Sequence, residues 1–150
     1  MTIYTDGACL NNPGPGGYGV ILIHGERVKE ISRGFPETTN NRMELMGVIA
    51  ALEALKYPCR VELYTDSQYI SRAINEGWLE RWQKKAWMTS SKTPVKNIDL
   101  WQRLLQLLAK HRVEFKWVKG HSGDHYNERC DVLARDAAGN AAKTTASYIG

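Results

Sequence analysis

Ile3-Tyr4-Thr5-Asp6-Gly7 and Leu63-Tyr64-Thr65-Asp66-Ser67 are two similar stretches, in each of which an apolar, β-like segment runs into Tyr-Thr-Asp. The repetition places two carboxylates, Asp6 and Asp66, at the ends of two predicted strands. If these strands are parallel neighbours, both aspartates emerge at one edge of a sheet, where α/β proteins bind their ligands. Adjacent carboxylates repel each other and favour a divalent cation. We therefore expect an α/β fold with a cation site at this edge.

The first third of the chain predicts an antiparallel meander. Gly25-Glu26 favours a tight hairpin, and the Gly/Pro/Asn-rich residues 11–17 favour a loop. The three strands predicted around these turns are residues 1–6, 18–24 and 27–35.

The rest of the chain completes a mixed, five-stranded sheet flanked by helices. Residues 41–56 have helical periodicity up to Pro58, and a fourth strand follows at residues 60–65. A strand-helix-strand crossover places this strand parallel to the first. The remaining elements predicted are helices over residues 68–76, 79–86, 98–111 and 127–138, and a fifth strand over residues 113–117.

Size and composition indicate a single domain. We expect residues 1–138 to form it and residues 139–150 to be a flexible tail. The longest apolar stretch, residues 20–23, is too short to span a membrane, so we expect a cytoplasmic monomer with no membrane partner. The three cysteines are far apart and lack CxxC spacing, which argues against a disulfide framework and against zinc.

Two further acids are candidates for the site of Asp6 and Asp66. Glu44, near the start of a predicted helix, either reaches back to Asn41 as a capping-box residue or faces the strand ends. Asp131 is either a solvated acid on the last helix or a fourth member of the cluster. Both roles in the cluster require the fold to bring the acids together.

His121 is a candidate for proton transfer. Gly120-His121-Ser122-Gly123 directly follows the fifth strand and predicts a loop with an imidazole at its tip. This histidine is either simply exposed, or a general acid or proton shuttle for chemistry at the acids.

The donor set favours a hard cation. Four carboxylates suit Mg²⁺ or Mn²⁺, whereas zinc prefers clustered His and Cys. Two such ions, about 4 Å apart, can activate a water on one side of a phosphodiester and stabilise the leaving oxygen on the other. Phosphodiester hydrolysis is the chemistry that fits this set best.

Residues 78–97, which we call the basic protrusion, point to a nucleic acid. They hold five Lys and Arg, one acid and three tryptophans, in a chain of formal net charge +4. Cations neutralise phosphates while aromatic faces pack against bases or sugars. Tryptophans at helical spacing, such as Trp78 and Trp82, are also typical of a core.

Five motifs in order resemble bacterial type 1 ribonuclease H over residues 1–138. They are Thr5-Asp6-Gly7 with Asn12-Pro13-Gly14-Pro15-Gly16-Gly17, Thr38-Thr39-Asn40-Asn41-Arg42-Met43-Glu44-Leu45, Thr65-Asp66-Ser67-Gln68, Gly120-His121-Ser122-Gly123, and Asn127-Glu128-Arg129-Cys130-Asp131. The resemblance implies a ribonuclease H-like fold and hydrolysis of the RNA strand of RNA/DNA hybrids, leaving 3′-hydroxyl and 5′-phosphate ends.

The resemblance also implies roles for individual residues. Its catalytic set comprises Asp6, Glu44, Asp66 and Asp131 as ligands of two Mg²⁺ ions, with Mn²⁺ as a substitute, and His121 for proton transfer or product departure. Its minor-groove contacts are Asn12, Asn40, Asn41 and Gln68, with Cys9 near the RNA strand. Its contacts with the DNA strand are a phosphate pocket of Thr39 and Asn97, and Trp78, Lys84, Lys85 and Trp87 in the basic protrusion.

Two departures from the family pattern concern the basic protrusion. The spacing from Asp66 to Gly77-Trp78 is one residue longer, so the tryptophan of the DNA channel is Trp78 or Trp82. The segment Met88-Thr89-Ser90-Ser91 is less basic than in relatives, which predicts a weaker electrostatic grip.

Two other functions remain open from the sequence. A DNA nuclease or strand-transfer enzyme uses the same sheet with clustered acids. A non-catalytic hybrid-binding module would need only the basic protrusion.

Overall fold

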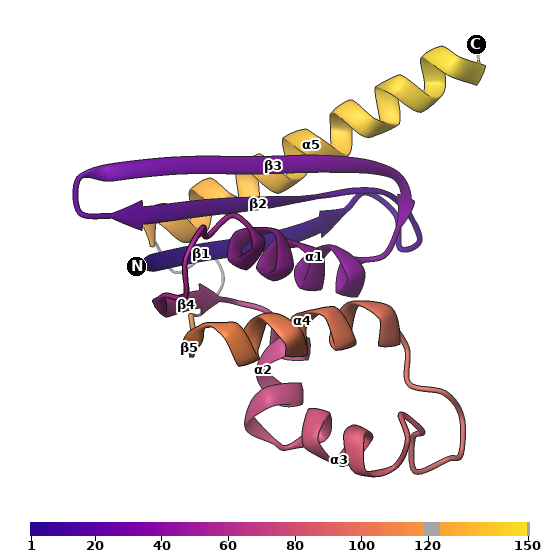
Figure 1. Ribbon diagram of the computed structural model, residues 1–150. Helices are drawn as coiled ribbons and strands as arrows, with labels where there is room; N and C mark the ends of the chain where they lie inside the picture. Colours follow the sequence, from indigo (N-terminus) through magenta and orange to yellow (C-terminus); the bar gives the residue numbers. More distant parts are fainter. Residues whose placement is uncertain (119–123, 150) are drawn as a thin grey trace.

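The computed structural model describes residues 1–118 and 124–149, with residues 144–149 described by their backbone alone. Figure 1 shows one twisted sheet with helices on both faces. The strand order is β3-β2-β1-β4-β5. The strands are β1 (Thr2–Cys9), β2 (Gly14–His24), β3 (Arg27–Thr38), β4 (Arg60–Thr65) and β5 (Arg112–Trp117). The helices are α1 (Asn40–Glu53), α2 (Gln68–Asn75), α3 (Trp78–Lys84), α4 (Ile98–Lys110) and α5 (His125–Ile149).

The predicted topology is confirmed. Strands β1, β2 and β3 pair antiparallel, whereas β4 pairs parallel to both β1 and β5. The turn at Gly25 has the left-handed backbone (φ 61°) that a tight hairpin favours. The chain thus returns through α1 to place β4 beside β1.

Several predicted boundaries were wrong, since β1 extends to Cys9 and β3 to Thr38 rather than to residues 6 and 35. Residues 11–17 do not all form a loop, because β2 already begins at Gly14. The last helix does not end at Ala138, since α5 continues to Ile149. The flexibility expected of residues 139–150 concerns their motion and stays a prediction.

Helix α5 lies very close to the sheet because β2 offers it no side chain at the crossing. A Cβ placed on Gly19 would lie 2.5 Å from the carbonyl oxygen of Cys130 and 2.7 Å from the Cβ of Leu133. Atoms cannot approach so closely, so only glycine permits this packing. Gly17, one of the glycines that predicted a loop, serves the same packing, because a Cβ there would lie 2.7 Å from the Cβ of Ala137 and 2.8 Å from the carbonyl oxygen of Ala134.

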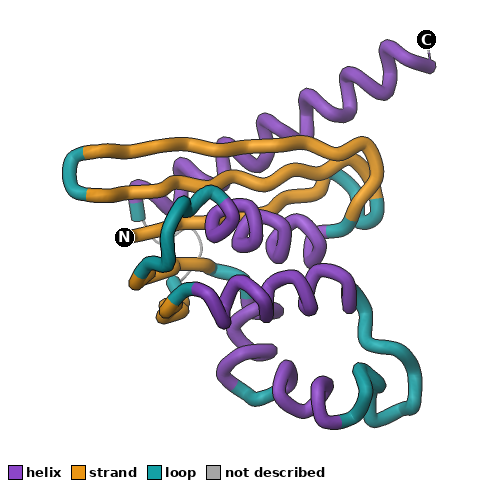
Figure 2. The backbone as a smooth tube through the Cα atoms, viewed as in Figure 1, coloured by secondary structure: helices purple, strands orange, loops and turns teal. Residues whose placement is uncertain are grey.

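On the other face, α1 and α4 cover the apolar core. Side chains of α1 such as Leu45, Val48 and Leu52 are fully buried against Ile3 and Leu63 of the sheet. Helices α2 and α3 and the loop after them form a lobe below the sheet (Figure 2). None of the helices in the described part of the chain is long and apolar enough to cross a membrane.

Replacing Gly19 by alanine is expected to destabilise the protein by about 3 kcal/mol, because the added methyl group overlaps the backbone of α5. The matched control is Gly139→Ala within α5, where a Cβ would meet nothing within 4 Å. That change should be neutral or stabilise by up to about 1 kcal/mol, since alanine is the better helix former. Urea unfolding of the two variants tests this, and equal stabilities would contradict the packing argument.

Candidate active site

The sheet register brings Asp6 and Asp66 together. Tyr4 of β1 is paired with Tyr64 of the parallel strand β4, and each aspartate lies two residues further along its strand direction. Side chains two residues apart in a strand point to the same face. The two carboxylates therefore emerge side by side at one edge, as the repeated motif predicts.

Asp6 is buried near Asp66 and Asp131. Asp6 is only 8% exposed, and its Oδ1 accepts a hydrogen bond of 2.9 Å from the backbone N–H of Gly7. Burial, followed by the charges of Asp66 and Asp131, raises the pKa of Asp6 to about 8. Burial also raises the pKa of Asp66, although hydrogen bonds from its own backbone, Asp6 and Asn127 oppose the rise. The cluster thus holds more negative charge than its surroundings neutralise.

Glu44 joins the cluster from α1. A Cβ on Gly7 would lie 2.5 Å from the backbone nitrogen of Glu44, so this glycine lets α1 approach β1. Thr39 caps the helix and accepts from the N–H of Arg42, which rules out the capping-box role for Glu44. The carboxylate of Glu44 instead accepts a short hydrogen bond from the Ser67 hydroxyl. Burial raises the pKa of Glu44 and this hydrogen bond opposes the rise.

Asp131 reaches the cluster from α5, on the opposite face of the sheet from α1. Its charge raises the pKa of Asp6, so the two carboxyl groups lie near each other, and the side chain of Asp131 is 24% exposed. Its Oδ2 also lies 2.9 Å from Nη2 of Arg135, one turn further along the helix. Asp131 is therefore a member of the cluster and not merely a solvated acid.

Two residues of the site were missed by sequence reasoning. Asn127 is 3% exposed and its side chain lies near Asp66, whose pKa it lowers, while its Oδ1 has no partner among the described residues. Ser67 both caps α2 and holds Glu44. Ser67 directly follows Asp66 and Asn127 precedes Asp131 by four residues in the quoted motifs, so their positions were visible although their contacts were not.

Three tyrosines form a floor beneath the acids. The rings of Tyr4 and Tyr64 are stacked, with centroids 4.7 Å apart and planes 11° apart. Tyr126, at the start of α5, packs on Tyr4 with a centroid distance of 5.3 Å. The floor fixes the first turn of α5, and with it Asn127, against the strands that carry Asp6 and Asp66.

The four acids fit a hard divalent cation by their chemistry. All offer carboxylate oxygens, and the raised pKa values of Asp6, Glu44 and Asp66 reflect repulsion and burial that a cation would relieve. Within residues 1–118 and 124–149, no three His, Cys, Asp or Glu side chains already close around one point. A bound ion would therefore draw the carboxylates closer.

The predicted minor-groove residues lie around the start of α1 and of α2. The Oδ1 of Asn12 accepts from the backbone N–H of Asn40 at 3.2 Å, joining the loop after β1 to the first turn of α1. Cys9 contacts the carbonyl oxygen of Thr38, while Asn41 and Gln68 are exposed. The fold thus groups these side chains beside the acids.

A hydrogen-bond network supports the predicted phosphate pocket of Thr39 and Asn97. Arg42 donates to Oδ1 of Asn97 at 3.2 Å and pairs with Asp99 at 2.9 Å. The amide of Asn97 donates to the Tyr69 hydroxyl at 3.3 Å, and the Trp101 indole N–H donates to the same hydroxyl at 2.9 Å. Helices α1, α2 and α4 are locked together where the pocket is expected.

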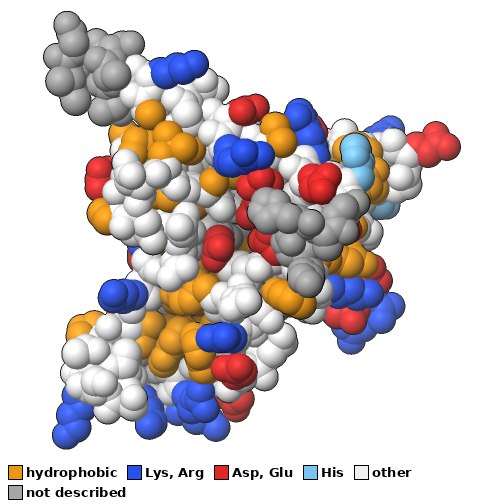
Figure 3. All heavy atoms as spheres, turned by 180° about the vertical axis from the view of Figure 1, so that it is seen from behind, with side chains coloured by type: hydrophobic (Ala, Val, Ile, Leu, Met, Phe, Trp, Pro, Cys, Tyr) orange, Lys and Arg blue, Asp and Glu red, His pale blue; other side chains and the backbone are white. Residues whose placement is uncertain are grey.

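The tryptophans of the basic protrusion serve partly as core. Trp78, Trp82 and Trp87 are half-buried and pack against the main core. The ring centroids of Trp82 and the buried Trp101 lie 5.6 Å apart. Lys84 and Lys85 are exposed. Figure 3 shows Lys and Arg side chains around this lobe and acidic side chains gathered in the middle of the same face.

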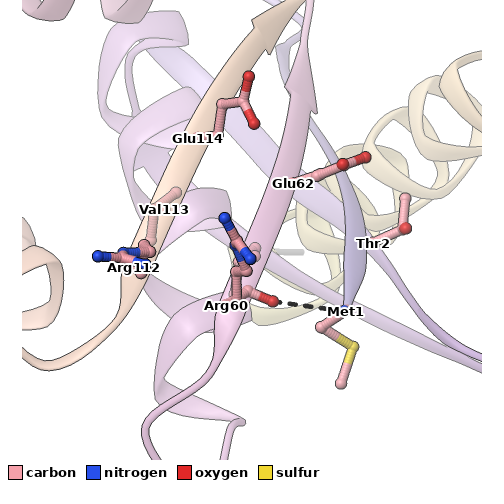
Figure 4. A pocket seen from close by; sticks show the side chains of 8 residues that line it. Met1, Thr2, Arg60, Glu62, Arg112, Val113 and Glu114 are labelled. Atoms are coloured by element: carbon pink, nitrogen blue, oxygen red, sulfur yellow. Dashed lines mark hydrogen bonds between the residues drawn. The ribbon is translucent and has the colours of Figure 1, made fainter.

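His121 lies outside the described residues. A separate cavity of about 480 Å³ lies at the opposite ends of β1, β4 and β5. Figure 4 shows the side chains that line it. Arg60 and Arg112, the first residues of their strands, line it together with Glu62 and Glu114. The cavity is therefore remote from the acidic cluster.

The RNase H family model matches residues 1–139. This chain belongs to the RNase H family. The ribonuclease H of Shewanella amazonensis is 62% identical over 138 residues, which cover 92% of this chain and 88% of that protein. The ribonuclease H of Phenylobacterium zucineum is 58% identical over 147 residues, covering 98% and 95% of the two chains.

Solved structures of RNase H proteins share the fold. LC9-RNase H1, a type 1 RNase H with the type 2 active-site motif, superposes with a TM-score of 0.81 at 36% identity, over 93% of this chain and 72% of that one. LC11-RNase H1, solved in complex with an RNA/DNA hybrid, gives a TM-score of 0.71 at 26% identity, over 93% and 97%. The predicted ribonuclease H-like fold is confirmed.

Asp6→Asn is expected to stabilise this RNase H, because it removes a buried carboxylate that its neighbours repel. The folded-state pKa of Asp6, about 8, lies above the ordinary value of 3.8, so the folded protein binds the proton more tightly than the unfolded chain does. Stability is therefore lost as pH rises between these values, and the variant escapes the loss. We expect a gain of at most about 5 kcal/mol at pH 8, which vanishes below pH 4.

Urea unfolding in EDTA at several pH values measures this gain. Asp136→Asn, an exposed acid on the same helix as Asp131, is the control and should change little. A wild type as stable at pH 8 as Asp6→Asn would contradict the electrostatic account.

Proposed function

We propose that this RNase H hydrolyses the RNA strand of RNA/DNA hybrids with Mg²⁺ held by Asp6, Glu44, Asp66 and Asp131. The observation that carries the proposal is the convergence of these acids from β1, α1, the end of β4 and α5 at one sheet edge. Family membership and the hybrid bound to the similar LC11-RNase H1 support the substrate.

When bound, two Mg²⁺ ions, or Mn²⁺ in their place, supply an activated water and charge neutralisation at the leaving 3′-oxygen, giving 3′-hydroxyl and 5′-phosphate products. The contribution of the chain is to hold the acids in position. Asn127 keeps Asp66 oriented, and the Ser67 hydroxyl keeps Glu44 turned toward Asp66. Pre-arranged ligands reduce the reorganisation needed when substrate arrives.

Substrate recognition is proposed for the face around the acids. Asn12, Asn40, Asn41 and Gln68 would contact the minor groove, with Cys9 at the RNA strand. An A-like minor groove displays 2′-hydroxyl groups, which distinguish RNA from DNA. Side chains grouped within reach of the cutting site are what such discrimination requires.

The DNA strand would be held at two places. Thr39 and Asn97 would bind one phosphate. Arg42 would hold Asn97 in place through the hydrogen bond that it donates to Oδ1 of Asn97. Lys84, Lys85, Trp87 and either Trp78 or Trp82 would contact the strand further along. The half-buried packing of the tryptophans gives the exposed lysines a rigid support.

The remaining expectations belong to the same proposal. His121 would move a proton to the leaving oxygen or assist product departure. The protein would act as a cytoplasmic monomer, in keeping with its three free cysteines.

Incubation with labelled hybrid tests the activity. We expect Mg²⁺-dependent cutting of the RNA strand, none of a matched DNA duplex, and a loss of about 10³-fold or more in Asp66→Asn with hybrid binding retained. Cutting of the DNA duplex would favour a DNA nuclease or strand-transfer enzyme. Hybrid binding with no turnover in Mg²⁺ or Mn²⁺ would favour a non-catalytic module.

Replacing Lys84 and Lys85 by alanine should weaken the grip on the hybrid without changing the chemistry. We expect KM to rise about 3- to 10-fold at unchanged kcat, and the salt dependence of binding to become shallower. The control is Lys29→Ala, an exposed lysine on β3. An equal effect in the control, or a fall in kcat alone, would remove the two lysines from the substrate interface.

A further inference from the structure

Asp131 is the one member of the acidic cluster that forms an ion pair with a basic side chain in the described part of the chain. Nη2 of Arg135 lies 2.9 Å from its Oδ2, whereas Asp6, Glu44 and Asp66 have no such partner there. Arg135 thus contacts one oxygen of a carboxylate that the proposed function assigns to a cation.

The backbone holds Arg135 at this position. It follows Asp131 by four residues on α5, where side chains one turn apart face each other. Ala134 and Ala137 beside it are buried against the sheet, so the helix cannot shift to separate the pair. The contact is therefore broken only by a movement of the arginine side chain.

That movement is open to the arginine. Its side chain is 60% exposed, and Arg135 lines a cavity of about 690 Å³ together with Glu128, Asp131 and Val132. The guanidinium can leave Asp131 and remain in solvent, or lie beside Glu128. An exposed ion pair of this kind is weak enough to exchange.

We propose that Arg135 is a positioning residue that competes with the metal ion for Asp131. In the ion-free protein it compensates part of the negative charge of the cluster and keeps Asp131 in place. A divalent cation must displace it, because both cations bind the same carboxylate and repel each other. Arg135 therefore weakens metal binding while making the empty site tolerable. The inference rests on the proposed metal-dependent function.

Calorimetric titration of the full chain with Mn²⁺ alone, without substrate, tests the proposal. Arg135→Gln should bind Mn²⁺ about 3- to 10-fold more tightly than wild type. Arg135→Lys should stay close to wild type, because it retains a competing cation. A merely structural role of Arg135 would not produce this tightening or its reversal by lysine.

Arg129→Gln is the matched control. It removes an arginine from the same helix, but this arginine pairs with Glu30 of β3 at 2.7 Å and not with the cluster. Its Mn²⁺ affinity should equal that of wild type. Equal tightening in both variants would reduce the effect to net charge and overturn the proposal.

The remaining outcomes separate the two proposals. Unchanged or weaker binding by Arg135→Gln, with wild type binding normally, would overturn competition and leave the metal site standing. Absence of Mn²⁺ binding in wild type and in Arg135→Gln would overturn the metal-dependent function itself. Thermal unfolding without metal confirms that each variant is folded before titration.

Discussion

The site depends on the close approach of two helices to opposite faces of one sheet. Gly7 lets α1 come within reach on one face, and Gly19, which pairs with Asp6 in the β1–β2 register, lets α5 do so on the other. With side chains at these two positions, Glu44 and Asp131 would be held further from Asp6 by the thickness of a methyl group or more. The lack of a side chain at Gly7 and Gly19 therefore determines how closely the acidic side chains approach each other.

The same closeness creates an electrostatic conflict that the protein resolves only in part. Buried carboxylates repel each other, and the hydrogen bonds from Gly7, Ser67 and Asn127 compensate some of this repulsion without removing it. Folding supplies the energy to assemble the cluster, through the apolar packing of α1 and the tyrosine floor under α5. Stability and function are thus opposed at the acids, which is common where a site must hold an ion.

Much of this could be predicted from the sequence, because strand order and parallel pairing follow from local patterns and connection rules. The two Tyr-Thr-Asp motifs predicted the sheet edge at which Asp6 and Asp66 meet. The role of Glu44 was harder to predict, because it depends on the N-cap being Thr39 and not Asn41, a difference of two residues. The contacts of Asn127 and Ser67 could not be read at all, because hydrogen bonds between distant segments depend on packing distances that no local pattern encodes. The end of α5 was missed because Gly139 resembles a helix stop, although nothing in the fold requires one there.

The length of α5 determines where a label can be attached to the protein. The helix is clamped to the sheet along its first half, and Figure 1 shows it running past the edge of β3 toward the C-terminus. The C-terminal end of α5 therefore lies away from the acids and from the lobe formed by α2 and α3. A fluorophore, an affinity tag or a surface linker attached at this end would be held away from the substrate face, leaving that face open to a long duplex.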